Sequence, residues 1–300
     1  MLWTKAILHL KTIKWSLHLL TIFVVANSKL SGQQDAKDSL IRTLEIYRID
    51  TSSTQHSRYY VDLLNELTAH YRFTNTDSLL AIANRVQLLT KEMGYNRGGA
   101  IAALRLGDYW ADKGNGTKAF AYYHEARVLA SKAKKPKVII EIINSISILQ
   151  TRSFQYEEAL DTYYKAIDLA KSNQLKEEEA QLRHNLGYFY AFFDLYDEAQ
   201  EQYLMADSIL VKLNQPISRA RTLSNLAFNS LKKRDLEKVL FYCEKSLNIL
   251  QHTKQFLWLS RTHWVKSNYY FENNELNNAL LELKKSDSIT NLLTNERDGL

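Results

Sequence analysis

Apolar side chains recur along this chain with a period of forty residues. A ladder of large aliphatic residues keeps one phase through most of the sequence: Ile49, Leu89, Leu129, Leu169, Ile209, Ile249 and Ile289. A second ladder in the same register holds small or β-branched residues: Ala119, Ala159, Ala199, Val239 and Ala279. Self-similarity at one fixed period is typical of stacked-repeat proteins, in which each unit buries its apolar face against its neighbours. The pattern therefore predicts a solenoid.

Within one period, the spacing of apolar positions is that of two helices. Ala199, Tyr203 and Ala206 are spaced i, i+4 and i+7, so they share one helix face. Gly187 on the preceding helix would let this face approach closely. We expect first helices near 57–71, 97–111, 137–151, 177–191, 217–231 and 257–271. Their partners are expected near 76–91, 116–131, 155–171, 195–212, 235–251 and 275–292.

These helix pairs resemble the tetratricopeptide repeat. The family pattern is matched by Leu186-Gly187-x-x-Tyr190 in the first helix, followed by Ala199, Tyr203 and Ala206. It recurs in an earlier unit with Leu106, Gly107, Trp110, Ala119, Tyr123 and Ala126. The usual period of the family is about 34 residues, and we interpret the longer period here as longer helices in each pair. The resemblance implies an all-α, right-handed solenoid of about six antiparallel helix pairs.

The repeat register divides the chain into segments. Residues 57–293 hold the six repeats, and residues 33–56 are expected to form a leading helix that caps the stack. Residues 294–300 are in register with the start of a further, incomplete repeat, because Leu300 continues the ladder of Ala180, Ala220 and Ser260. This favours a chain that is the front part of a longer protein.

The N-terminal segment, residues 1–32, has the composition of a secretory signal peptide. Lys5, Lys11 and Lys14 precede an apolar run from Trp15 to Ala26, and small polar residues follow it. The run is too short for an ordinary membrane span. We therefore expect export to the periplasm or cell surface of a bacterium. The alternative is an uncleaved segment that tethers the chain to the membrane.

Charge argues against a nucleic-acid partner. The net charge is +6, but residues 1–33 contain four lysines and no acidic residue. Without these lysines the chain holds 35 basic and 33 acidic residues. A nucleic-acid-binding protein would carry a basic surface on its folded part.

The sequence holds no recognisable catalytic or metal-binding pattern. The histidines do not form an H-E-x-x-H pair, and Gly114-Asn115-Gly116 is better explained as a turn between helices than as a phosphate loop. Cys243, the single cysteine, lies in the register of buried tyrosines and is interpreted as a core residue. We expect no enzymatic activity, no cofactor and no metal.

The resemblance implies that the first helices line a concave groove that binds a peptide or protein. Transferred by register, it selects residues on the outward face of these helices: His184, Tyr188, Arg221, Asn225, Phe228, Arg261, Trp264 and Asn268. Aromatic rings supply contact area, and Arg and Asn can fix a carboxylate or backbone. The carboxylate clamp of chaperone-binding members is not reproduced, because Leu104, Asp108 and Val265 occupy matching places.

Two functions fit these observations. The first is an exported scaffold for protein–protein interaction. The alternative is the extracytoplasmic input region of a bacterial sensor kinase or membrane-tethered transcription regulator, which signal-bearing arrays of this type resemble.

Overall fold

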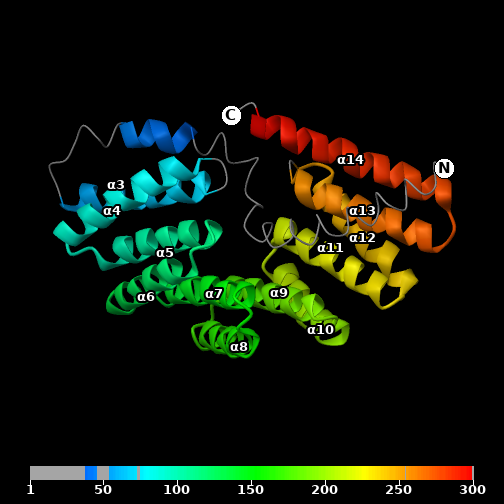
Figure 1. Cartoon of the computed structure of the whole chain (residues 1–300), viewed down its shortest axis with the longest axis horizontal. Coiled ribbons are helices and arrows are strands. Elements are labelled where there is room, and N and C mark those ends of the chain that lie inside the picture. Colours follow the sequence, from blue (N-terminus) through cyan, green and yellow to red (C-terminus); the bar gives the residue numbers. More distant parts are fainter. Residues whose placement is uncertain (1–37, 46–53, 73–74, 254, 299–300) are drawn as a thin grey trace.

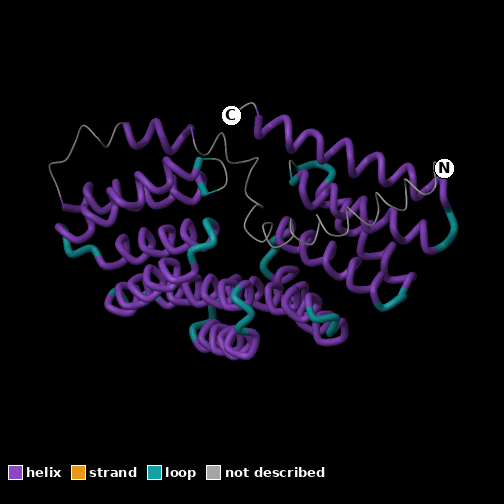
Figure 2. Tube along the Cα trace, in the orientation of Figure 1, coloured by secondary structure: helices purple, strands orange, loops and turns teal. Residues whose placement is uncertain are grey.

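The computed structural model describes residues 38–45, 54–72, 75–253 and 255–298. Within these residues every regular element is a helix (Figure 2). None of the described helices combines the length and apolarity needed to span a membrane. The expected signal peptide, residues 1–32, lies outside the described residues. Of the expected leading segment 33–56, residues 38–45 are helical and residues 54–56 belong to the first long helix.

In the part of the chain that the structure describes, six helix pairs follow one another (Figure 1). The first helices of the pairs are α3 (Thr54–Tyr71), α5 (Asn96–Asp112), α7 (Pro136–Arg152), α9 (Lys176–Phe192), α11 (Pro216–Lys232) and α13 (Phe256–Glu272). Their partners are α4 (Thr76–Glu92), α6 (Gly116–Lys132), α8 (Tyr156–Ser172), α10 (Tyr196–Lys212), α12 (Leu236–Leu250) and α14 (Leu276–Asp298). Residues 294–298, expected to begin a further repeat, continue α14.

The turns between helices repeat every twenty residues. At each turn that lies wholly within the described residues, one residue has the left-handed backbone conformation: Gly94, Gly114, Lys134, Phe154, Gln174, Asp194, Asn214, Arg234 and Asn274. At the end of α6 the N–H of Lys135 donates to the carbonyl of Ala130, and that of Lys134 to Ser131. This pair of bonds is the Schellman motif, which satisfies carbonyls left open at the helix end. Regular turns therefore keep successive helices in one register.

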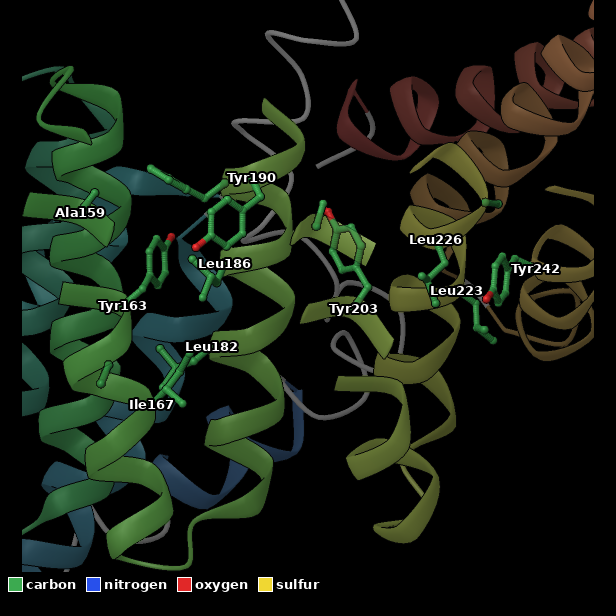
Figure 3. Close-up of a cluster of buried hydrophobic side chains, with 14 of the residues drawn as sticks. Ala159, Tyr163, Ile167, Leu182, Leu186, Tyr190, Tyr203, Leu223, Leu226 and Tyr242 are labelled. Carbon is green, nitrogen blue, oxygen red and sulfur yellow. The ribbon is translucent and has the colours of Figure 1, made fainter. Parts of the chain in front are cut away.

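Glycines of two first helices face tyrosines of the partner helices. An added Cβ at Gly107 would lie 2.4 Å from ring carbons of Tyr123, and at Gly187 it would lie 2.7 Å from those of Tyr203. Both rings are buried. Figure 3 shows the central cluster, where tyrosines and leucines of α8 to α12 fill the space between helices. The close approach of the two helices that was expected at Gly187 is therefore present in the structure.

The pairs form an arch, with odd-numbered helices along its inner side (Figures 1 and 2). Each odd helix from α3 to α13 packs closely against the next odd helix, whereas no two even helices among those described bring Cα atoms within 8 Å of each other. The even helices therefore fan apart on the outer side. The stacked, all-helical solenoid predicted from the ladders is confirmed.

Candidate ligand-binding groove

A hollow of about 700 Å³ runs along the inner side of the arch. Its lining comes almost entirely from the odd helices α3, α5, α7, α9 and α11. Equivalent positions of successive odd helices face this hollow, so their side chains form ladders along it. One such ladder changes from apolar or acidic to basic as the chain proceeds: Ile101, Glu141, Gln181, Arg221 and Arg261.

At the N-terminal end the charged residues are paired with one another. Asp108, which is 1% exposed, accepts bonds from Arg72 Nη1 at 2.6 Å and Arg105 Nη1 at 3.3 Å. The hydroxyl of Tyr123 donates to the same carboxylate at 2.9 Å. Burial, followed by the charge of Asp108, raises the pKa of Tyr123 well above its ordinary value. This network holds α3, α5 and α6 together and leaves no uncompensated charge on Asp108.

The middle of the groove presents amide side chains. Gln181 Nε2 donates to Asn185 Oδ1 at 3.0 Å, and Asn185 Nδ2 donates to Asn144 Oδ1 at 2.8 Å. These three residues line the hollow on α7 and α9. Amides can both donate to and accept from the backbone of an extended peptide.

His184 connects α9 to α11 through two hydrogen bonds, which together define which ring nitrogen carries the proton. Thr222 Oγ1 donates to the carbonyl of Ser218, so it accepts from Nδ1 of His184 at 2.9 Å. Nε2 of His184 then accepts from Nδ2 of Asn225 at 3.3 Å. Burial, followed by the charges of Arg221 and Arg261, lowers the pKa of His184 well below its ordinary value. The imidazole is therefore neutral, and Oδ1 of Asn225 is buried without a donor.

Arg221 and Arg261 lie on either side of this network with no carboxylate partner in the described part of the chain. Their side chains are buried, with residues 8% and 9% exposed, and Nε of each has no acceptor. Arg221 lines the hollow, and every other arginine or lysine of that lining is paired with a carboxylate: Arg72, Arg97, Arg105, Lys137 and Arg152. Burial lowers the pKa of Arg221 to about 10 and also lowers that of Arg261.

Aromatic rings compensate these two charges only in part. The guanidinium carbons lie 5.2 Å (Arg221) and 5.6 Å (Arg261) from the ring centroid of Trp258. Arg261 also lies 5.5 Å from the ring of Phe228. A cation–π contact contributes about 0.5–2 kcal/mol, whereas desolvating an unpaired ion costs several kcal/mol. We call Arg221, Asn225, Trp258 and Arg261 the arginine site.

The residues selected from the sequence lie in or beside this cluster. His184, Arg221, Asn225 and Arg261 are buried, and His184 and Arg221 line the hollow. The other four, Tyr188, Phe228, Trp264 and Asn268, are partly buried. Phe228 stacks on Trp264 at 6.1 Å, and Nδ2 of Asn268 donates to the carbonyl of Trp264. These contacts explain packing for Phe228, Trp264 and Asn268, and a binding role of all eight stays a prediction.

Sequence reasoning missed several members of the groove. Trp258 was passed over because it lies outside the register of the selected face, although its ring lies within 6 Å of two arginines that are forty residues apart. Asn144, Gln181 and Asn185 continue ladders already visible in the sequence, and following each ladder through every unit would have found them.

The described residues contain no group of three or more His, Cys, Asp or Glu side chains that could hold a metal ion. Cys243 is buried in the central cluster, and burial raises its pKa to about 12. A thiol in this state is a poor nucleophile.

Comparison with known proteins gives structural neighbours alone. No protein-family model matches this sequence, and no curated protein shows significant sequence similarity to it. BtubC from P. vanneervenii superimposes with a TM-score of 0.65 and 21% identity, covering 74% of this chain and 93% of that chain. A Rap protein complexed with competence and sporulation factor gives 0.59 and 12%, covering 94% and 98%.

A third neighbour is a signal transduction ATPase with a tetratricopeptide repeat sensor from Pyrococcus horikoshii. Its TM-score is 0.56 at 15% identity, and the match covers 80% of this chain and 38% of that chain. At such identities the similarity shows the fold.

Proposed function

We propose that this chain, a solenoid of the tetratricopeptide type, is a scaffold that binds a peptide or protein in the groove of its odd helices. One observation carries the proposal: Arg221 is buried in the lining of the hollow without the carboxylate that every other arginine or lysine of the lining has. An uncompensated buried charge costs stability, so its retention favours a role in binding. The neighbouring Rap structure, a complex with competence and sporulation factor, supports the same use of the fold.

Selection from a random peptide library tests this proposal. Peptides are selected on wild-type protein and measured again on a variant carrying Arg221→Glu and Trp264→Ala. We expect the selected peptides to lose at least about tenfold in affinity, because the variant reverses one charge of the groove lining and removes the Trp264 ring selected with it from the sequence. The control is Lys212→Glu, which makes the same charge change on the exposed end of α10. Peptides that bind the groove variant as tightly as wild type would contradict the proposal.

Export is part of the proposal and depends on residues 1–32. Their composition supports a signal peptide or a membrane tether. In the alternative function, the input region of a sensor kinase or membrane-tethered regulator, the same groove would receive the signal. Fusion of residues 1–40 to a reporter that is active only outside the cytoplasm tests export, and N-terminal sequencing of the product distinguishes cleavage from tethering. An inactive reporter would count against export of the chain, whether residues 1–32 are cleaved or kept as a membrane tether.

A further inference from the structure

We propose that the arginine site binds a carboxylate group of a peptide together with a neighbouring backbone N–H. The inference rests on the proposed function, since it names the chemical group that the groove receives at α11 and α13. The first part of the argument is charge. Arg221 and Arg261 both lie within 6 Å of the same Trp258 ring, and no carboxylate of the described chain pairs with either one. The site therefore has two cations and needs an anion.

His184 does not change this balance. Its hydrogen bonds to Thr222 and Asn225 require a protonated Nδ1 and an unprotonated Nε2, so the ring carries no charge. It also fixes the amide of Asn225, whose Nδ2 is used by the imidazole. The guanidinium fork suits a carboxylate, which accepts two parallel N–H bonds.

The second part of the argument is the unused acceptor. Oδ1 of Asn225 is buried and has no donor. A buried acceptor without a partner costs about 1–3 kcal/mol. An inorganic anion such as sulfate would offer it nothing, because such an anion has acceptors alone. A peptide supplies both groups, since every carboxylate of a peptide lies within a residue or two of a backbone N–H.

The remainder of the groove offers the carboxylate of a bound peptide no unpaired cation. At the N-terminal end, Arg72 and Arg105 are occupied by Asp108, Asp112 and Glu141. The middle offers the amides of Asn144, Gln181 and Asn185, which suit backbone rather than charge. A bound peptide is thus expected to place its carboxylate at the arginine site and to extend from there toward α7.

The experiment uses N-acetylated random octapeptides as the probe. They are made in four forms: with a free or an amidated C-terminus, and in each case with or without Asp and Glu. Immobilised full-length protein captures peptides, which are quantified by mass spectrometry. Wild type is compared with Arg221→Met and with Arg219→Met. Arg219 is a matched control on the same helix, because it already pairs with Asp207 at 2.8 Å and does not line the hollow.

We expect wild type and Arg219→Met to retain carboxylate-bearing peptides about tenfold or more over peptides with no carboxylate. Arg221→Met is expected to lose this preference. Enrichment of unamidated peptides without Asp or Glu assigns the C-terminal carboxylate, and enrichment of amidated peptides with Asp or Glu assigns a side chain. Equal retention of all four forms overturns the inference while the proposed function stands. If wild type retains no peptide in any form, both fail.

Thermal unfolding without peptide separates a binding role from a structural one. Removing an unpaired buried charge should raise the Tm of Arg221→Met by several degrees, because Met fills a similar volume without the desolvation cost. A structural guanidinium would give a lower Tm, and that result overturns the inference. Arg221→Gln, which removes the charge but keeps an N–H donor, provides a second comparison of peptide retention.

Discussion

At the scale of single residues, the stack depends on complementary sizes across each helix pair. Gly107 faces Tyr123 and Gly187 faces Tyr203, with room for a hydrogen but not for a methyl group. In the fifth unit the same two positions hold Ala227 and Cys243, both fully buried. A larger residue on the first helix is thus matched by a smaller one on the second. This complementarity, rather than helix propensity, explains glycine in the middle of a helix.

We expect Gly187→Ala to destabilise the protein by about 1–3 kcal/mol. The new Cβ would lie 2.7 Å from the ring of Tyr203, which is buried and cannot swing away. Urea unfolding followed by circular dichroism measures the change. The matched control is Gly116→Ala at the start of α6, where an added Cβ meets nothing within 4 Å. Equal effects of the two substitutions would show that packing against Tyr203 is not the cause.

His184 should make stability depend on pH. In the folded chain the pKa of His184 lies well below its ordinary value of 6.5. Between the folded and the unfolded pKa, the unfolded chain therefore binds a proton that the folded chain does not. Its contribution is complete above about pH 6.5 and is lost as pH falls below it, by at most about 1.4 kcal/mol per pH unit. Urea unfolding of wild type and His184→Asn between pH 5 and 8 measures this slope. His124→Gln, an exposed histidine on α6, is the control, and the prediction fails if wild type and His184→Asn show equal slopes.

At the scale of elements, backbone strain lies in the turns rather than in the helices that they connect. Each turn that lies wholly within the described residues places one residue in the left-handed conformation, yet of these residues only Gly94 and Gly114 are glycines. Asn214 and Asn274 tolerate this conformation, whereas Phe154, with φ +62°, does not. The side chain of Phe154 is 79% exposed and makes an edge contact with Tyr156 at 6.0 Å. Strain at this turn is therefore offset by little packing.

Phe154→Gly should stabilise the chain by about 0.5–1 kcal/mol. The substitution relieves backbone strain at the turn between α7 and α8 and gives up one exposed ring. Chemical denaturation measures the difference, with Gly114→Ala as the reverse substitution at an equivalent turn. We expect Gly114→Ala to lower stability, because its φ is +75° and the site is otherwise open. A loss of stability in Phe154→Gly would mean that the contact with Tyr156 outweighs the strain.

At the scale of the whole molecule, stability should be highest in the centre. The largest buried cluster extends from Ile140 to Val265 and joins four consecutive units. Among the described residues, the last unit has a neighbouring unit on one side alone, and the outer side of the first unit is covered by the short helix 38–45. In a stacked repeat, stability is roughly a sum of units and their interfaces. We expect amides of α9 and α11 to exchange hydrogen most slowly and those of α3 and α14 fastest. Exchange measured by mass spectrometry tests this gradient, and uniform protection along the chain would contradict it.

Much of this architecture could be predicted because its signals repeat. Observed helix ends differ from the expected ones by a few residues, since each boundary is supported by ladders in several units. Register also selected Arg221 and Arg261 as binding residues, which stays a prediction. Their burial did not follow from register, because it depends on how closely adjacent units approach. Nor could the sequence show that the ring of Trp258 contacts both of them or that His184 accepts a hydrogen bond from Nδ2 of Asn225.

The twenty-residue interval between turns has a consequence for how this chain can change over generations. Loss or gain of forty codons would remove or add one complete hairpin while every remaining hairpin still met its neighbour through equivalent positions. The length of the inner surface could thus be altered in discrete steps by recombination, without redesign of the joints. A segment whose length is not a multiple of forty residues would break the register between neighbouring hairpins, and selection would remove it.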